Sequence, residues 1–387
     1  MKSFIIFIVI VVVIYISTCV YTAKRLMQCA EGLYYRRAFF IVYITLCVLF
    51  FAERALFRIQ SAAIQYIASI GTFWLAFLFY LLLGCLLFDA VRIINRIAHI
   101  CPDDLLQIKK IKNIVFFIIT GVTVLVVSAG AVNARFVKIR RIKINFPYSR
   151  GITRPLVFLA VSDIHLGKIS GKNALTELKR HALRVQPDAI LLAGDIIDEN
   201  PSWLIRHRTG DLFKDIKSGH GFYACTGNHE YISGIENTAD YLESLNIKLL
   251  RDTAVRIGDT GIIAVGRDDI SALRFGLPKR LSLEQIFSNN SLRMDKNENK
   301  IIIVLDHQPS SLQETILSRA DILICGHTHH GQLWPINFIT SRIFPLSYGY
   351  RKEGNLHYLV SGGIGTWGPP VRTSARPEII ELRIYPE

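Results

Sequence analysis

Three long stretches without a charged residue lie in the first third of the sequence. They cover residues 4–22, 66–88 and 114–134. Each is close to the roughly 20 apolar residues that a helix needs to cross the hydrocarbon core of a bilayer. Uninterrupted apolar segments of this length are typical of membrane-spanning helices and not of the half-buried helices of a soluble domain. Residues 1–144 are therefore predicted to form a membrane region.

A fourth apolar stretch, residues 38–57, contains Glu53 and Arg54 near its end. We interpret it as a fourth span, with an interfacial or re-entrant helix as the alternative. The first stretch follows Met-Lys and could be a signal peptide, but its apolar run exceeds a typical signal and no small-residue cleavage site follows it. We therefore expect four retained spans. Nine cationic residues on one side against eight on the other give no orientation.

The positive charge of the chain is unevenly distributed. The formal net charge is +14, and residues 1–144 hold 17 Lys and Arg against 5 Asp and Glu, whereas the remainder holds 28 against 26. The excess cations therefore flank the apolar stretches, where anionic lipid headgroups attract them. They do not form a basic face on the second part of the chain, so no nucleic-acid partner is predicted.

The composition changes after residues 145–155, a linker that contains Pro147, Gly151 and Pro155. From residue 156 to 387, short apolar runs alternate with segments of helical periodicity. The strand-like runs are 156–161, 189–193, 222–225, 262–265, 301–305 and 322–325, and the helical segments include 175–185 and 238–245. This alternation predicts a layered α/β domain.

Polar residues follow five of these apolar runs. They are Asp163 and His165; Asp195 and Asp198; Asn228, His229 and Glu230; His307; and His327 and His329. Each motif alone is also typical of an ordinary turn or helix cap. Together they indicate a ligand site, because loops beyond the carboxyl ends of strands can converge in α/β sheets. Asp, Asn and His without thiolate suit Mn, Fe or Zn, and so many ligands exceed one tetrahedral ion, so two ions are expected.

The order D-x-H, G-D-x-x-D, G-N-H-E, H, G-H-x-H resembles that of the calcineurin-like metallophosphoesterase superfamily across residues 155–385. The resemblance implies a two-sheet α/β sandwich flanked by helices, and metal-assisted hydrolysis of phosphoesters. It also implies a site with two divalent ions, for which we favour manganese over iron or zinc. The membrane region would precede this domain.

The resemblance also assigns roles to the residues of the motifs. It implies one metal held by Asp163, His165 and His329, a second held by Asn228, His307 and His327, Asp195 as the bridge between them, His229 as the catalytic residue, and Asp198 and Glu230 as supporting residues.

The segment 360–372, VSGGIGTWGPPVR, is similar to the membrane-anchored bacterial branch of this superfamily, whose relatives include UDP-2,3-diacylglucosamine hydrolases acting on a lipid A precursor. That branch has glycine where this chain has His330 in GHTHHGQ. His330 and Trp367 are candidate contacts for substrate. The resemblance implies a multi-pass protein of the bacterial cytoplasmic membrane that acts on a phosphorylated small molecule or lipid.

These observations together predict a membrane-anchored phosphohydrolase that cleaves a phosphoester or pyrophosphate bond. The alternative is a membrane sensor or scaffold that binds a phosphorylated ligand without turnover, and the complete ligand set argues against it. A transporter with a soluble appendage is disfavoured, because Asp89 stands at the end of its predicted span and no paired charges are expected inside the spans.

Overall fold

The computed structural model describes residues 2–30, 34–55, 62–102, 108–289 and 299–387. It divides into two compact units. The first comprises residues 1–131 with 368–371, and the second comprises residues 132–367 with 372–387. We describe each unit by itself.

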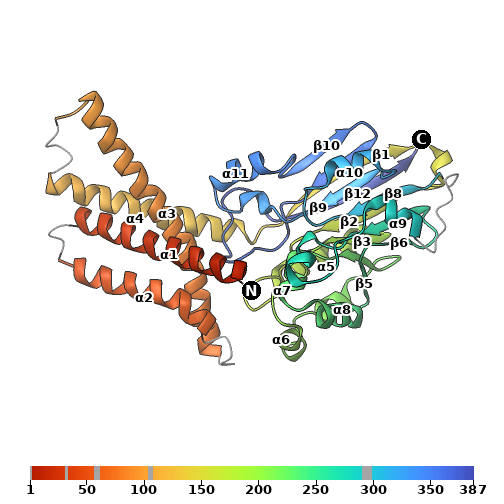
Figure 1. The fold of residues 1–387 in the computed structure, drawn as a ribbon, viewed down its shortest axis with the longest axis horizontal. Helices are drawn as coiled ribbons and strands as arrows, with labels where there is room; N and C mark the ends of the chain where they lie inside the picture. Colours follow the sequence, from red (N-terminus) through yellow and green to blue (C-terminus); the bar gives the residue numbers. More distant parts are fainter. Residues whose placement is uncertain (1, 31–33, 56–61, 103–107, 290–298) are drawn as a thin grey trace. The chain divides into compact units, whose positions relative to one another are not determined.

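The first unit is helical. Its elements are α1 (Lys2–Cys29), α2 (Arg36–Ala55), α3 (Ala62–Ala98) and α4 (Lys109–Asn133), the last of which ends in the second unit (Figure 1). Three segments are long and apolar enough to cross a membrane, judged by length and composition: Val9–Cys29, Ser69–Ala98 and Lys109–Asn133. Among the described residues, α2 is not long and apolar enough by the same criteria. It contains most of the predicted span 38–57. Residues 56–57 of that span lie outside the described part.

One ion pair inside the helical unit differs from the expectation. Helix α3 continues to Ala98, so Asp89 lies within the helix and not at its end. Its carboxylate is 2.7 Å from the guanidinium of Arg25 on α1 and accepts a hydrogen bond from the hydroxyl of Tyr21 at 2.7 Å. A charge in an apolar helix is tolerated when it is paired in this way. The sequence could not reveal the pair because its members are far apart in the chain.

The second unit is built on two six-stranded sheets. Its strands are β1 (Lys138–Phe146), β2 (Leu156–Val161), β3 (Ala189–Ala193), β4 (Phe222–Cys225), β5 (Ile247–Leu250), β6 (Thr253–Arg256), β7 (Ile262–Gly266), β8 (Ile301–Leu305), β9 (Ile322–Cys325), β10 (Gly349–Glu353), β11 (Leu356–Val360) and β12 (Glu378–Pro386). One sheet has the order β1-β12-β2-β3-β4-β5 and the other β10-β11-β9-β8-β7-β6. Strands β2 to β5 are parallel neighbours, as are β7, β8 and β9.

The main core lies between the two sheets. It contains the inward side chains of both, such as Phe158 and Leu191 from the first sheet and Ile303 and Ile324 from the second. Their neighbours along each strand face outward and are also buried, because helices cover both outer faces. This explains why these strands are continuous apolar runs without polar alternation.

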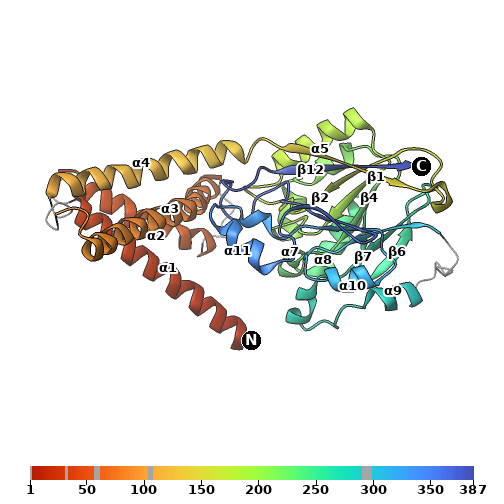
Figure 2. The same cartoon turned by 90° about the horizontal axis from the view of Figure 1, so that it is seen from above.

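The covering helices lie on opposite sides of the sandwich (Figure 2). Helix α5 (Lys172–Val185) packs Leu175 and Leu178 on the first sheet. Helices α9 (Leu283–Asn289) and α10 (Leu312–Leu317) cover the second sheet. The other helices are α6 (Pro201–Arg206), α7 (Asn228–Ile232), α8 (Ile235–Ser244) and α11 (Ile336–Ile343). The predicted two-sheet sandwich flanked by helices is confirmed.

Strand β1 starts the first sheet earlier in the chain than the composition suggests. Its residues Lys138–Phe146 pair in parallel with Glu378–Pro386 of β12, although 1–144 were assigned to the membrane region and 145–155 to a linker. The alternating cations of KIRRIKINF resemble the charges that flank a span. In the folded unit Lys138, Arg141 and Lys143 are exposed on an edge strand, and Arg140 pairs with the buried Glu378. The apolar side of the strand, Ile142, Ile144 and Phe146, is buried.

Candidate metal centre

The predicted ligands lie in loops that follow β2, β3, β4, β8 and β9. Strands β2, β3 and β4 are parallel in one sheet, and β8 and β9 are parallel in the other, so each set of loops leaves the same edge of its sheet. The two sheets pack face to face, which brings the loops together. The structure thereby gathers side chains that are up to 166 positions apart in sequence, Asp163 and His329 among them.

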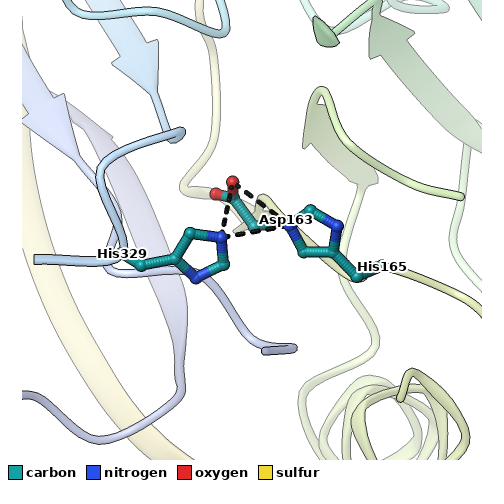
Figure 3. Close-up of side chains that lie close together, drawn as sticks. All are labelled: Asp163, His165 and His329. Carbon is teal, nitrogen blue, oxygen red and sulfur yellow. Dashed lines mark hydrogen bonds and ion pairs between the residues drawn. The ribbon is translucent and has the colours of Figure 1, made fainter. Parts of the chain in front are cut away.

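The first group consists of Asp163, His165 and His329 (Figure 3). The Nε2 atoms of the two histidines face each other at 3.0 Å. The Oδ1 atom of Asp163 is 3.4 Å from Nε2 of His329 and 3.9 Å from Nε2 of His165. All three residues are buried. Two imidazole nitrogens and a carboxylate oxygen directed at one point form a donor set that suits a divalent transition metal.

The second group consists of Asp195, His307 and His327. Nε2 of His307 is 3.2 Å from Oδ2 of Asp195 and 3.2 Å from Nδ1 of His327. The other ring nitrogen of His307 lies 2.8 Å from the carbonyl oxygen of Ala193, to which it can only donate. This contact fixes the tautomer and leaves the Nε2 lone pair directed at the group, which is how metal-binding histidines are commonly held.

Asp195 lies between the two groups. Its Oδ2 atom is 3.2 Å from Nε2 of His307 and 3.8 Å from Nε2 of His165. Burial alone would raise the pKa of Asp195, but the imidazole of His307 holds it well below its usual range. The carboxylate is therefore ionised and within reach of both groups, as a bridging ligand must be.

Asn228 supplies an independent sign that the residues fit a cation. Its side-chain oxygen is buried and has no hydrogen-bond partner among the described residues. An unsatisfied buried oxygen of this kind costs about 1–3 kcal/mol unless a further group binds it. A metal ion would satisfy it, and the Asp, Asn and His donor set matches the hard-to-borderline ions Mn, Fe and Zn. The residues present thus fit the divalent metals that the sequence predicts.

His229 joins the same cluster through His165 and Asp195. Its ring packs edge-on against that of His165 with centroids 4.7 Å apart, and its Nδ1 atom is 2.5 Å from Oδ1 of Asp198. Burial alone would lower the pKa of His229, but Asp198 and then Asp195 raise it to about 9. His229 therefore holds a proton at neutral pH in the metal-free protein, which a general acid requires.

Glu230 organises the backbone of the site. Its buried carboxylate accepts the backbone N–H groups of Gly227 at 2.6 Å, Asp195 at 3.0 Å and Ile196 at 2.7 Å. It thus ties the loop after β3 to the start of α7. Asp198 lies beside two histidines of the site. Its Oδ1 atom is 2.5 Å from Nδ1 of His229 and 3.7 Å from Nδ1 of His165.

The backbone at the ligands is unusual. Five of the predicted ligands have left-handed φ angles: Asp163 (53°), His165 (48°), Asp195 (51°), His327 (71°) and His329 (46°). Each such conformation costs a residue other than glycine roughly 1–2 kcal/mol. Strain of this kind persists where the surrounding fold over-determines a functional geometry. Asp and His adopt positive φ more often than most residues other than glycine, but the sequence does not show which of them do so.

Two glycines make room for this geometry. A Cβ atom on Gly194, which has φ +78°, would lie 2.7 Å from Nδ1 of His307. A Cβ atom on Gly227 would collide with the carboxylate of Asp195. The glycines of the G-D and G-N-H-E motifs are therefore required by the close approach of ligand side chains and not only by the turns.

Arg372 is a site residue that the sequence analysis did not identify. It is fully buried, donates to the carbonyl oxygens of Gly362 at 2.6 Å and Gly365 at 3.1 Å, and lies 3.0 Å from Nδ1 of His329. Burial lowers its pKa to about 10. The sequence signal that could have revealed it is a lone cation in the otherwise uncharged tract GGIGTWGPPVR, since a buried charge requires a purpose.

The two candidate substrate contacts lie close to the ligand loop. His330 adopts φ 48°, and its ring packs on Tyr348 with centroids 4.8 Å apart. Trp367 is 58% exposed, and its backbone N–H and carbonyl pair with the side chain of Gln332 at 3.0 and 2.8 Å. The left-handed φ explains why glycine suits the position of His330 in the resembling sequences.

The fold and the cluster together define a metal-dependent hydrolase built on a two-sheet sandwich. The sequence pattern of the calcineurin-like phosphoesterase family matches residues 156–331. A metallophosphoesterase of Aquifex aeolicus is 31% identical over 227 residues, which cover 58% of this chain and 82% of that protein. The chain belongs to the calcineurin-like metallophosphoesterase family, so it is a metal-dependent phosphoesterase.

Two further relatives extend this similarity. A metallophosphoesterase of Campylobacter jejuni is 29% identical over 394 residues, which cover 98% of both chains. A protein of Bos taurus named transmembrane protein with metallophosphoesterase domain is 32% identical over 240 residues, which cover 59% of this chain and 52% of that one. Three helices among the described residues are long and apolar enough to cross a membrane, so the chain is associated with a membrane.

Proposed function

We propose that the protein is a multi-pass, membrane-anchored phosphohydrolase with two divalent metal ions, which cleaves a phosphoester or pyrophosphate bond of a lipid-linked or nucleotide-lipid substrate. The observation that carries the proposal is the shared membership of the clusters. Asp195 and His165 each belong to two of the three groups of closely spaced ligand atoms, so the groups form one continuous centre. A continuous centre of two ions is the arrangement used for in-line phosphoryl displacement.

Each residue of the centre has a place in this proposal. Asp163, His165 and His329 would hold one ion, Asn228, His307 and His327 the other, and Asp195 would bridge them. When bound, the ions would neutralise the phosphate and make hydroxide available near neutral pH, and manganese is our preferred metal.

His229 would donate the proton to the departing oxygen. Its Nδ1 atom is engaged by Asp198 at 2.5 Å, so the proton for the leaving group would come from Nε2. The carboxylate of Asp198 holds the ring in place and stabilises its protonated form. This arrangement supports a general acid that is ready before substrate binds.

The test uses the full chain, purified in detergent and loaded with Mn²⁺. Bis(p-nitrophenyl) phosphate and UDP-2,3-diacylglucosamine would serve as soluble and lipid substrates for the wild type, Asp195→Asn and His229→Ala. His207→Ala, at an exposed histidine of the loop after α6, is the matched control. We expect activity in the wild type and the control, and its loss in the two site variants.

The outcomes separate the alternatives. Metal binding without hydrolysis of any phosphoester would favour the sensor or scaffold. Equal activity in the wild type and both site variants would show that the catalytic centre lies elsewhere. Hydrolysis of the soluble diester alone would keep the phosphohydrolase and remove the lipid substrate.

A further inference from the structure

Helix α11 follows the last metal-ligand motif and exposes an unusual number of apolar side chains. None of its residues is buried. Phe338 is 55% exposed, Ile339 58% and Ile343 65%, and the preceding Trp334 is 53% exposed. We call these four residues the α11 patch. Ile339 and Ile343 are four positions apart on the helix, so they lie next to each other on its surface. A grouped apolar surface of this kind marks an interaction site.

Contacts connect the segment around α11 with the loop that carries His327 and His329. Phe344, directly after α11, packs edge-on against the ring of His327 with centroids 6.1 Å apart. The hydroxyl of Thr328 donates to the carbonyl of Ser347, and the backbone of Gly331 approaches Asn337 too closely to leave room for a Cβ atom. Whatever binds the α11 patch is therefore held beside the metal centre.

Hydrogen bonds also connect the α11 patch to the end of α4. Asn133, the last residue of this candidate span, donates to the carbonyl of Arg372 at 2.8 Å and accepts from Nε of Arg376 at 3.1 Å. The neighbouring Thr373 accepts the backbone N–H of Trp334 at 2.8 Å through its hydroxyl. The end of a helix that is long enough to cross a membrane is thus two hydrogen-bonded steps from the α11 patch.

The connection in sequence is equally short. Helix α4 ends at Asn133 and β1 begins at Lys138. Residues 134–137 can span at most about 3.3–3.6 Å each, so they confine the domain to the neighbourhood of the membrane surface. The lipid surface is therefore present at high effective concentration for every exposed group near Asn133.

We propose that the α11 patch inserts into the interfacial region of the lipid bilayer and holds the metal centre at the membrane surface. Its composition fits this partner, because Trp and Phe favour the headgroup level and Ile the acyl boundary. The exposed Arg342 in the last turn of α11 can reach anionic headgroups while its stem lies along the apolar surface. This inference concerns position at the membrane and does not depend on the substrate.

The test uses the full chain reconstituted in vesicles of phosphatidylglycerol and phosphatidylcholine. A photoreactive p-benzoylphenylalanine replaces Phe338 or, in a second variant, Ile339. The matched control carries it at Leu317 of α10, which is 78% exposed and lies outside the α11 patch. Retained metal content shows that each variant is folded. After illumination, mass spectrometry measures lipid adducts.

We expect about tenfold more lipid adduct at positions 338 and 339 than at 317, because an interfacial helix buries its apolar face among the acyl chains. Lipid labelling at 338 and 339 that does not exceed the level at 317 overturns the proposal. Light-dependent dimers in place of lipid adducts overturn it as well, since they assign the α11 patch to a second copy of the chain.

Discussion

The two ligand groups of the metal centre differ in what lies behind their histidines. Behind His307 is the carbonyl oxygen of Ala193, whereas behind His329 is the guanidinium of Arg372. A carbonyl accepts the proton of Nδ1 and leaves the Nε2 lone pair free, but a guanidinium can only donate, which favours a proton on Nε2. The group of His307 is thus arranged for a metal beforehand, and the group of His329 must release a proton or shift Arg372 to bind one.

The pKa values of the two histidines are shifted in opposite directions, because charges of opposite sign lie beside them. Although burial alone would lower the pKa of His307, the Asp195 carboxylate raises it well above its usual range. Burial and the guanidinium of Arg372 hold the pKa of His329 well below its usual range. The comparison teaches that two ions bound as proposed would face different electrostatic surroundings. We therefore expect the ion at His307 to bind more tightly and the ion at His329 to exchange more readily.

Asp195→Asn removes the carboxylate that lies between the two groups and should have the largest effect. An amide oxygen carries no charge, so both proposed ions would lose an anionic ligand, and kcat/KM should fall about a thousandfold or more. Steady-state kinetics and elemental analysis of bound metal would measure it. The exposed Asp240→Asn is the control, with no change expected. Two retained ions in Asp195→Asn would contradict the bridging role.

Glu230→Gln tests the hydrogen bonds with which the Glu230 carboxylate holds the backbone around Asp195. The variant replaces an acceptor of several backbone N–H groups by an amide whose NH₂ faces some of them. We expect a loss of about 2–3 kcal/mol in the free energy of unfolding, because buried polar groups lose their partners. Activity should fall as the loop of Asp195 shifts. Chemical denaturation in detergent would measure the first effect, and unchanged stability would show that the carboxylate is dispensable.

Arg372→Met separates the two groups from each other. It removes the guanidinium beside His329 and leaves His307 untouched. The affinity of the ion proposed at His329 should therefore rise about tenfold, because a repelling cation is gone, while the affinity at His307 should not change. Stepwise Mn²⁺ titration followed by electron paramagnetic resonance would resolve the two sites. Arg208→Met, at an exposed arginine, is the control. Weaker binding at His329, or an equal change at both sites, would contradict the difference between the two groups.

Asp198→Asn should change the pH dependence of turnover. The folded-state pKa of His229 is raised to about 9, so its proton is present at neutral pH and is lost only as the pH rises through that value. Without Asp198, burial acts with less opposition, and the descending limb of kcat should move to lower pH by about one unit or more. Profiles of the wild type and variant would show it. An unchanged descending limb would show that Asp198 does not set the pKa of His229 during turnover.

His330→Gly should have the smallest effect. Glycine relieves the left-handed backbone but loses the contact with Tyr348 and gains freedom in the unfolded chain, so the unfolding free energy should change by less than about 1 kcal/mol. Activity within about twofold of the wild type is expected. A loss of more than about tenfold would show that His330 contacts substrate in addition to Tyr348.

The positions of the strands were predictable because their chemistry is local. Runs such as 301–305 are apolar throughout since both faces are covered, and His307 lies two positions after the run. The convergence of the five loops was predictable from the rule that parallel strands gather sites at their carboxyl ends. The candidate residues could therefore be picked out from strand ends, whereas their roles at the metals rest on the resemblance.

Other features depend on contacts across the fold and stayed hidden. Strand β1 looks like a membrane flank until β12, more than 230 positions later, pairs with it. The positive φ of Asp163 and the burial of Arg372 are imposed by neighbours that no local pattern announces. Arg25 and Asp89 reveal their ion pair only when α1 and α3 are side by side.

The sheet order β1-β12-β2 has a consequence for how the protein is made. The strand between β1 and β2 is β12, which leaves the ribosome later than β1 to β11. The membrane helices can insert while β1 lacks this neighbour, so the first sheet closes only after β12 has been made. Long-range pairing of this kind is slow and leaves an edge open to wrong partners. The lysines and arginines of β1 place positive charge on this unpaired edge, which discourages aggregation.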